Sequence, residues 1–286
     1  MIATFVLFLR EGLEASLIVS ILFAALRQLG QMEKARAVWA GVGLAIFTSL
    51  VGGVALYITI HNYAGSIFQA VFETFTYLLA VVLLTTMTFW MQKHSRYLKR
   101  DIMAKAGLAG SGLALALLAF STVGREGLET AVFTLAFAFQ MNGALLLLGA
   151  SLGLLASIGL SFLVYKLGYK LDFRIFFRVM GILLLFFAAG LLGDAIQNMQ
   201  QLGWLPFATA PMWNTAGILP ESSTLGDILH TFLGYAEAPT ILQGIFYAAY
   251  LIVAGSLFAR LTRKPVMPPP APSVKTSAKE QVHSRA

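Results

Sequence analysis

Long apolar segments recur along this chain at the length that a membrane-crossing helix needs. About 20 residues in a helix cover the hydrocarbon core of a bilayer, which is roughly 30 Å thick. Of the 286 residues, 58% are hydrophobic and only 12% are charged, which is more apolar than a water-soluble domain. Strand-like alternation is absent, so an all-α integral membrane protein is favoured. The apolar segments are 3–26, 37–60, 67–91, 106–140, 143–165, 178–199 and 239–259.

The basic residues indicate which connections face the cytoplasm. All of the 20 Lys and Arg residues except Arg10 and Arg125 lie in the first, third and fifth loops and in the C-terminal tail. Cytoplasmic loops collect Lys and Arg, so this alternation predicts seven transmembrane helices, with the N-terminus outside and the C-terminus in the cytoplasm. The same placement explains the net charge of +7 without a nucleic-acid partner.

Three segments need expectations of their own. Residues 106–122 are Gly-rich, and they either belong to one long, tilted helix or form a separate interfacial or re-entrant piece. Residues 200–238 mix turn and apolar residues, which predicts a short helix or re-entrant piece on the outer face. We expect residues 1–262 to form one membrane domain, and residues 263–286, which are proline-rich and then basic, to be a disordered cytoplasmic tail.

The pentapeptide REGLE occurs twice inside the apolar segments, as Arg10–Glu14 and Arg125–Glu129. Positions i, i+3 and i+4 share one face of a helix, so each copy presents two carboxylates and one guanidinium together. A charge at the centre of a membrane helix costs about 2.5 to 3.5 kcal/mol on insertion scales. Three charges per copy therefore predict that both motifs face the protein interior, where they pair with other groups.

Four carboxylates from two helices are a ligand set for a hard cation. We expect Glu11, Glu14, Glu126 and Glu129 to bind ferric iron, manganese, magnesium or calcium, whereas the absence of cysteine argues against copper(I). The counter-ions are Arg10 and Arg125, which hold the carboxylates ionised and oriented. For the first copy alone, a snorkelling anchor or an interhelical ion pair is an equal alternative, but the second copy favours the cation site.

The two copies lie 115 residues apart, on segments predicted to cross the membrane in opposite directions. This spacing predicts two inverted repeats of three helices each, residues 1–100 and 106–200, followed by one more helix. The depth of each copy stays open, because the first lies only ten residues from the N-terminus. One alternative makes it an outer set of ligands and the second copy a deeper set.

Other polar residues are secondary candidates. Glu73 and Asp194 lie inside apolar segments, where each is either a secondary ligand or proton acceptor or an ordinary hydrogen-bonded residue near the outer headgroups. Met87 and Met91 are interpreted as packing residues and not as a thioether copper track. The residues that could capture cations on the outer face, although solvated loop polarity is favoured there, are Glu221, Asp227, His230 and Glu237.

With Arg-Glu-x-x-Glu in the first and fourth of seven membrane helices, the sequence resembles the oxidase-dependent iron permease family, whose bacterial members are EfeU-like. The likeness covers residues 1 to about 262 and includes the late stretch LGYAEAPTILQGIFYAAYL. The resemblance implies a high-affinity iron permease of the cell membrane, which moves iron, as Fe3+ or as Fe2+ oxidised on passage, into the cytoplasm through the four motif glutamates. It also implies extracytoplasmic partner proteins that oxidise or deliver iron.

Two alternatives to iron transport remain at this stage. One is a transporter of another hard divalent cation such as Mn2+, and the other is a membrane complex subunit without transport activity. An enzyme is disfavoured because the chain has no cysteine and no His-Glu-x-x-His pattern. We expect no bound organic cofactor, and iron is expected as the transported substrate only.

Overall fold

The long apolar segments form helices in the computed structural model, which describes residues 1–61, 65–94, 98–167 and 173–263. Within these ranges the regular elements are helical, apart from one isolated bridge between Pro211 and Thr240. The predicted disordered tail, from residue 264 on, lies outside the described residues. The elements are α1 (Ile2–Gln28), η1 (Met32–Lys34), α2 (Ala35–His61), α3 (Ile67–His94), α4 (Leu98–Leu108), α5 (Gly112–Gln140), α6 (Gly143–Leu167), α7 (Phe173–Gln201), α8 (Thr224–Leu233) and α9 (Ile241–Arg263).

The predicted all-α membrane architecture is confirmed by the length and apolarity of these helices. In the described part of the chain, five are long and apolar enough to cross a membrane: Met32–Ile58, Ile67–Lys93, Gly143–Leu163, Ile175–Gln201 and Ile241–Thr262. The helices α1 and α5, with 27 and 29 residues, are as long as these but contain the motif charges. The protein is therefore a multi-pass membrane protein, and the number of seven spans stays a prediction.

Residues 112–122 belong to the long helix α5, as the first of the two sequence alternatives expects, whereas residues 106–108 end a separate short helix. The short helix α4 ends at Leu108, and Ser111 caps the start of α5 by accepting a hydrogen bond from the Ala114 amide at 3.2 Å. The buried residues Ile102 and Ala106 pack α4 against the end of α1. Part of the third loop, a basic segment that the apolar pattern leaves outside the spans, is therefore a helix.

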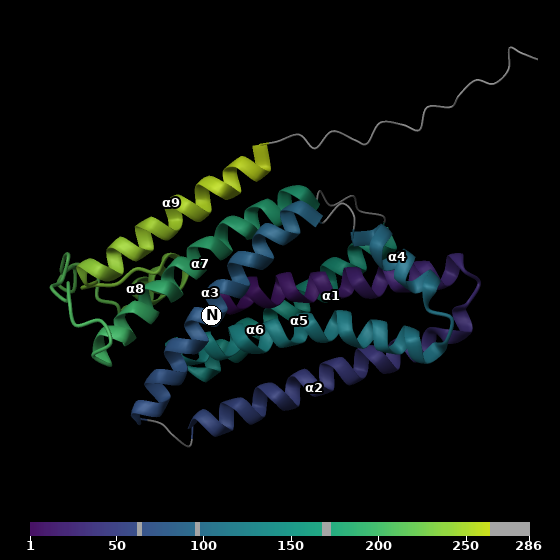
Figure 1. The fold of residues 1–286 in the computed structure, drawn as a ribbon, viewed down its shortest axis with the longest axis horizontal. Coiled ribbons are helices and arrows are strands. Elements are labelled where there is room, and N and C mark those ends of the chain that lie inside the picture. The colour runs from purple at the N-terminus through teal and green to yellow at the C-terminus, as the bar shows by residue number, and fades with distance from the viewer. Residues whose placement is uncertain (62–64, 95–97, 168–172, 264–286) are drawn as a thin grey trace, which may run out of the picture.

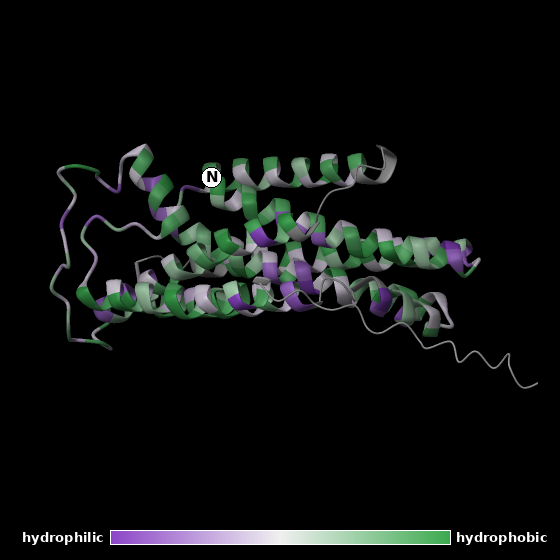
Figure 2. Cartoon of the chain, turned by 90° about the horizontal axis from the view of Figure 1, so that it is seen from above, coloured by the Kyte–Doolittle hydropathy of each residue, from purple (hydrophilic) through white to green (hydrophobic). Residues whose placement is uncertain are grey.

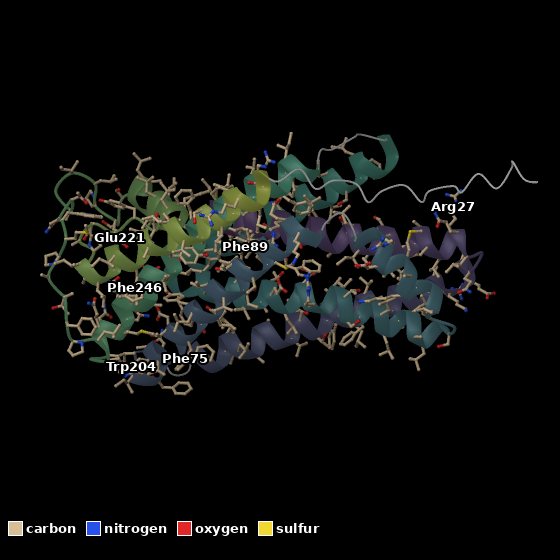
Figure 3. The ribbon with its side chains drawn as sticks, turned by 45° about the horizontal axis from the view of Figure 1, so that its top comes forward. Arg27, Phe75, Phe89, Trp204, Glu221 and Phe246 are labelled. Carbon is tan, nitrogen blue, oxygen red and sulfur yellow. The ribbon has the colours of Figure 1, made fainter. Side chains whose placement is uncertain are left out.

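The long helices lie roughly parallel or antiparallel in pairs (Figure 1). The most extensive contacts join α2 to α5, α1 to α6 and α3 to α7, and α9 covers α7. Most of the helical ribbon is hydrophobic, whereas hydrophilic residues gather toward the ends and near the middle of the bundle (Figure 2). Arg27 lies at one end, and Trp204 and Glu221 lie at the other (Figure 3).

Two buried apolar clusters divide the interior lengthwise. The first includes Leu7, Phe133 and Leu191, and the second includes Leu22 and Leu115. Along both α1 and α5, the charged motif lies between residues of one cluster and residues of the other. The motifs therefore occupy a polar layer in the middle of an otherwise hydrocarbon core.

The segment after α7 folds back against the bundle. Ser223 caps α8 by accepting from the Gly226 amide at 3.0 Å, and Gly234 ends it in the left-handed region with φ 64°. Gly234 packs on Gly190, and the Phe232 ring lies 5.3 Å from that of Phe187, centroid to centroid. Because Gly190 precedes the end of α7 by about three helical turns, α8 re-enters beside α7. The expected short helix is confirmed.

The glycine of each motif allows a neighbouring helix to come close. A Cβ on Gly12 of α1 would lie 2.3 Å from Ser157 Oγ of α6, and a Cβ on Gly127 of α5 would lie 2.2 Å from Ser49 Oγ of α2. Each added Cβ would also lie 2.8 Å from the Cβ of the same serine, so rotation of the hydroxyl would not relieve the contact and the helices would have to shift.

We expect Gly12→Ala to lower the thermal unfolding temperature of the detergent-solubilised protein by several degrees, because the added methyl group displaces Ser157 at a cost of about 1 to 3 kcal/mol. The matched control is Gly159→Ala on the same helix as Ser157, where a Cβ meets nothing within 4 Å. Adding Ser157→Gly to Gly12→Ala should restore much of the loss. Equal unfolding temperatures for the two single variants would contradict the close approach.

Candidate metal centre

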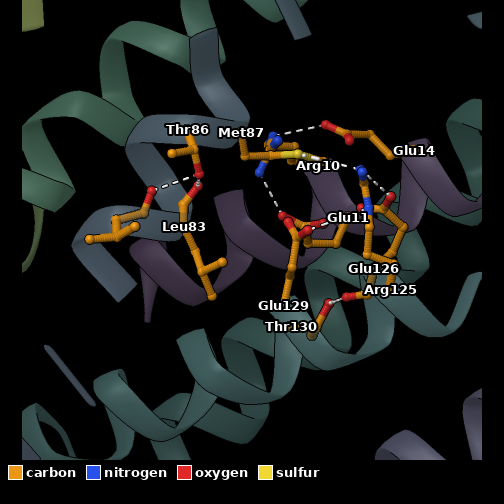
Figure 4. A network of polar contacts seen from close by, with 11 residues as sticks. Arg10, Glu11, Glu14, Leu83, Thr86, Met87, Arg125, Glu126, Glu129 and Thr130 are labelled. Atoms are coloured by element: carbon orange, nitrogen blue, oxygen red, sulfur yellow. Dashed lines mark hydrogen bonds and ion pairs between the residues drawn. The ribbon is translucent and has the colours of Figure 1, made fainter. Parts of the chain in front are cut away.

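The two REGLE motifs meet in one buried cluster. One carboxylate oxygen each from Glu11, Glu126 and Glu129 lies within 4.8 Å of the other two, and all three residues are buried. Figure 4 shows the side chains of α1 and α5 pointing toward one another. The alternative of an outer and a deeper ligand set is therefore wrong: the first copy is level with the second because α1 starts well inside the bundle, short of the end at which α9 starts (Figure 1).

The first copy is a closed, buried ion-pair group. Arg10 Nη1 donates to Glu11 Oε1 at 2.6 Å, and Arg10 Nε lies 2.9 Å from Glu14 Oε1. The second contact is an ion pair by distance, but its angles are not those of a hydrogen bond. The Arg10 side chain is only 2% exposed. A guanidinium this deep requires its carboxylate partners, because an unpaired buried charge costs several kcal/mol.

The second copy has the same pairing in a more open setting. Arg125 Nη2 donates to Glu126 Oε1 at 2.9 Å, and Arg125 Nε lies 3.5 Å from Glu129 Oε1. The Arg125 side chain is 46% exposed, although the Glu126 side chain is 4% exposed. The Arg125 Cζ atom lies 5.0 Å from the centroid of the Trp90 ring. The two arginines thus differ in access, although the two motifs are identical.

Several buried polar atoms in the cluster have no hydrogen-bond partner among the described residues. They are the Oε2 atoms of Glu11, Glu126 and Glu129, the Oε1 atom of Glu14, which has only its ion pair with Arg10, and the Nη2 atom of Arg10. Buried polar groups in folded proteins are nearly always satisfied, and each exception requires an explanation. Four carboxylates facing two guanidiniums also leave an excess of two negative charges when all are ionised. A divalent cation would satisfy both the free oxygens and the excess charge.

The donor set fits such a cation. Carboxylate oxygens bind hard and borderline cations at about 2.0 to 2.6 Å, so ligands on opposite sides of an ion lie roughly 4 to 5 Å apart. The oxygens of Glu11, Glu126 and Glu129 fall within that span. Glu14 lies one turn further along α1 and reaches the cluster through Arg10. The four predicted carboxylates and both predicted counter-ions are therefore brought together.

Some of the secondary candidates form a separate group between α7 and α8. Asp194 Oδ2 accepts from Gln140 Nε2 at 2.6 Å and lies 3.9 Å from His230 Nε2. His230 Nδ1 lies 2.7 Å from the Tyr235 carbonyl oxygen and 3.1 Å from Glu221 Oε1. Asp194, which was predicted inside an apolar segment, thus lies in one group with His230 and Glu221, which were predicted on the outer face. We call these three residues the outer polar group.

The remaining candidates have ordinary structural partners. Glu73 accepts from the Tyr77 hydroxyl at 2.7 Å within α3. Glu237 accepts from the Glu221 amide at 2.8 Å and so closes the loop before α9. Asp227 lies in the first turn of α8, where a carboxylate favours the helix terminus.

Sequence reasoning missed the contribution of α3 to the cluster. Met87 is buried beside Met91 and Phe177, which confirms its interpretation as a packing residue. Its sulfur, however, also accepts from Arg125 Nη2 at 3.5 Å, and Trp90 lies against the same guanidinium. The spacing of Met87 and Trp90 placed them on one face of α3, but nothing in the sequence indicated that α5 packs against that face.

Comparison with known proteins shows which family this chain belongs to. The family model described as "Iron permease FTR1 family" matches residues 1–263. The chain is 35% identical to "Ferrous iron permease EfeU" of Shigella sonnei over 265 residues, which cover 91% of this chain and 95% of that protein. It is 37% identical to the protein of the same name from Yersinia pseudotuberculosis over 268 residues, which cover 90% and 93%. No solved structure matches the chain. A match over nearly the whole chain, together with two REGLE motifs that meet inside a helical bundle, means that this protein belongs to the iron permease FTR1 family.

Proposed function

We propose that this protein moves iron into the cytoplasm through one site formed by Glu11, Glu14, Glu126 and Glu129. Two observations on Glu11, Glu126 and Glu129 carry this proposal. Each has a carboxylate oxygen within 4.8 Å of one from both of the others, and each has a buried oxygen without a hydrogen-bond partner among the described residues. A structural ion-pair cluster would use its oxygens fully, whereas a transport site must leave ligands free for an incoming ion. The membership of an iron permease family makes iron the cation.

The oxidation state is proposed as Fe2+. A site made of carboxylates alone accepts both Fe2+ and Fe3+ and favours the harder Fe3+, which the prediction from the sequence named first. The two relatives, however, are named ferrous iron permeases. The excess of two negative charges in the cluster also matches a divalent ion. Partner proteins outside the membrane that oxidise or deliver iron are proposed from the family resemblance alone.

We further propose seven membrane spans built from two inverted repeats and one additional helix. The contacts support the repeats, because the first helix of each half packs on the second helix of the other half, α1 on α6 and α5 on α2. The close contacts of the motif glycines join the same helix pairs: Gly12 of α1 contacts Ser157 of α6, and Gly127 of α5 contacts Ser49 of α2. Gly12 and Gly127 are 115 positions apart, and Ser49 and Ser157 are 108 apart.

A second pair of contacts obeys the same spacings. A Cβ on Gly41 of α2 would lie 2.2 Å from the Ala116 carbonyl oxygen, and one on Gly149 of α6 would lie 2.3 Å from the Met1 carbonyl oxygen. Met1 and Ala116 are again 115 positions apart, and Gly41 and Gly149 are again 108 apart. Contacts that repeat with one offset for α1 and α5 and another for α2 and α6 are expected of duplicated halves.

Inverted halves place the two arginines on opposite sides of the carboxylates. With the N-terminus outside, α1 runs inward and α5 runs outward, so Arg10 lies on the outer side and Arg125 on the inner side. Each guanidinium neutralises carboxylates when no cation is bound and yields them when one arrives. Of the two, the inner guanidinium, Arg125, is the more exposed, and the outer one, Arg10, is the more buried.

The outer polar group is proposed as a station before the main site. His230 contacts both Asp194 and Glu221 at the end of the bundle that the topology places outside. Glu73 is proposed as a secondary residue along the same approach, and Asp227 and Glu237 as loop-stabilising residues. An ion entering from outside would meet this group first.

Removal of one motif carboxylate should abolish iron uptake. We expect Glu126→Gln and Glu14→Gln to lower initial 55Fe uptake into proteoliposomes by at least roughly tenfold, since an amide supplies one neutral ligand and no charge. Glu33→Gln, an exposed site in η1, is the matched control and should transport like the wild type. Uptake that survives both motif substitutions would contradict the site.

The two arginines should differ in their effect on stability. We expect Arg10→Met to destabilise the protein by about 3 to 5 kcal/mol, because it leaves buried carboxylates without their counter-ion. Arg125→Met should cost clearly less, since its side chain is 46% exposed. Thermal unfolding of the purified variants in detergent measures the difference. Equal losses would contradict the different burial of the two arginines.

The topology can be tested with single cysteines, because the chain has none of its own. Ser222→Cys, in the segment before α8, should react with a membrane-impermeant maleimide in intact cells. Glu33→Cys, in the first basic loop, should react only after the membrane is permeabilised. The opposite pattern would reverse the orientation, and labelling of both residues in intact cells would rule out seven spans.

A further inference from the structure

The methionine at position 87 touches the cation-binding layer from a third helix. Its sulfur lies 3.5 Å from Arg125 Nη2, and this same nitrogen lies 2.9 Å from Glu126 Oε1. The nitrogen is positively charged and donates to both atoms. A metal cation that took its place would therefore have a carboxylate oxygen on one side and a thioether sulfur on the other.

Arg125 is able to give up this place. Its side chain is 46% exposed, and its Cζ atom lies 5.0 Å from the centroid of the Trp90 ring, which offers an alternative partner for the guanidinium. Arg10, in contrast, is 2% exposed and is enclosed by its own two glutamates. The arrival of a cation therefore displaces the guanidinium of the second motif more readily than that of the first.

Met87 itself is held in position. It is 5% exposed and packs in a small apolar cluster with Met91 and Phe177. The sulfur consequently faces the site without rearrangement of α3. The charged groups identified in the cluster are carboxylates and guanidiniums. Beside their oxygen and nitrogen atoms, the thioether sulfur of Met87 is a soft ligand atom.

We propose that Met87 is a ligand of the transported cation and makes the site selective for softer divalent ions. The inference rests on the proposed iron site. A thioether contributes little to binding of Ca2+, Mg2+ or Fe3+, which prefer oxygen, and more to binding of Fe2+ and of the soft ion Cd2+. An all-carboxylate site would accept the abundant hard cations, and one sulfur shifts the preference toward ferrous iron.

Cadmium bound to the full-length protein in detergent tests the coordination directly. X-ray absorption at the cadmium edge should show a sulfur neighbour in the wild type and in Met91→Leu, and only oxygen neighbours in Met87→Leu. Leucine preserves the volume of methionine, and Met91 is the matched control because it lies in the same cluster one turn away. A wild-type spectrum without sulfur, or an unchanged spectrum in Met87→Leu, would overturn the proposal.

Competition between cadmium and iron during transport tests whether Met87 makes the site selective for softer ions. In proteoliposomes supplied with Fe2+ under reducing conditions, the cadmium concentration that halves iron uptake should rise by at least roughly tenfold in Met87→Leu relative to Met91→Leu. Inhibition by Ca2+ should stay equal or become stronger. Equal cadmium inhibition in both variants would overturn the role of Met87 in selectivity.

The two proposals fail separately. If the wild type binds cadmium through sulfur but moves no iron, Met87 remains a ligand and the permease function is wrong. If the wild type moves iron and its cadmium spectrum contains no sulfur, the iron site stands and Met87 is a packing residue only.

Discussion

The pairing of two arginines with four glutamates in the middle of a hydrocarbon core is the interaction on which this structure depends. Neither α1 nor α5 could remain in a membrane with its charges facing lipid, because the cost per charge is several times the gain from one leucine. Each helix satisfies part of the need within its own motif, through i,i+1 and i,i+4 contacts. The remainder requires burial, so the motif glutamates of α1 and α5 face the interior of the bundle.

Small residues make that enclosure close. Gly12 and Gly127 lie inside the motifs themselves and admit serine side chains of α6 and α2 against the backbone. In a bilayer the apolar effect between helices is weak, so such tight contacts supply much of the association. The glycine of each REGLE motif thus depends on the neighbouring helix as much as the charged residues do. The same five residues therefore specify both the charged layer and the packing of the helices.

Much of this fold and site could be predicted from the sequence, because each inference used a local rule. Segment length indicated the helices, and the i,i+4 spacing placed Arg10 beside Glu14, as the structure confirms. Local rules do not indicate which helix faces pack against each other. The re-entry of α8 beside Gly190 and the contact of Met87 with Arg125 both depend on packing between distant segments. The different exposure of Arg10 and Arg125 arises in the same way, since identical pentapeptides have different neighbours.

The two apolar clusters on either side of the charged layer have a consequence for the rate of passage. Along α1 and α5, a cation leaving the layer in either direction meets closely packed side chains such as Leu7 and Phe133 or Leu22 and Leu115. A hydrated ion does not diffuse through packed hydrocarbon, so every crossing requires helices to separate and close again. Such motions take microseconds to milliseconds or longer. The flux should therefore saturate with ion concentration and rise steeply with temperature, which distinguishes a carrier from an open pore.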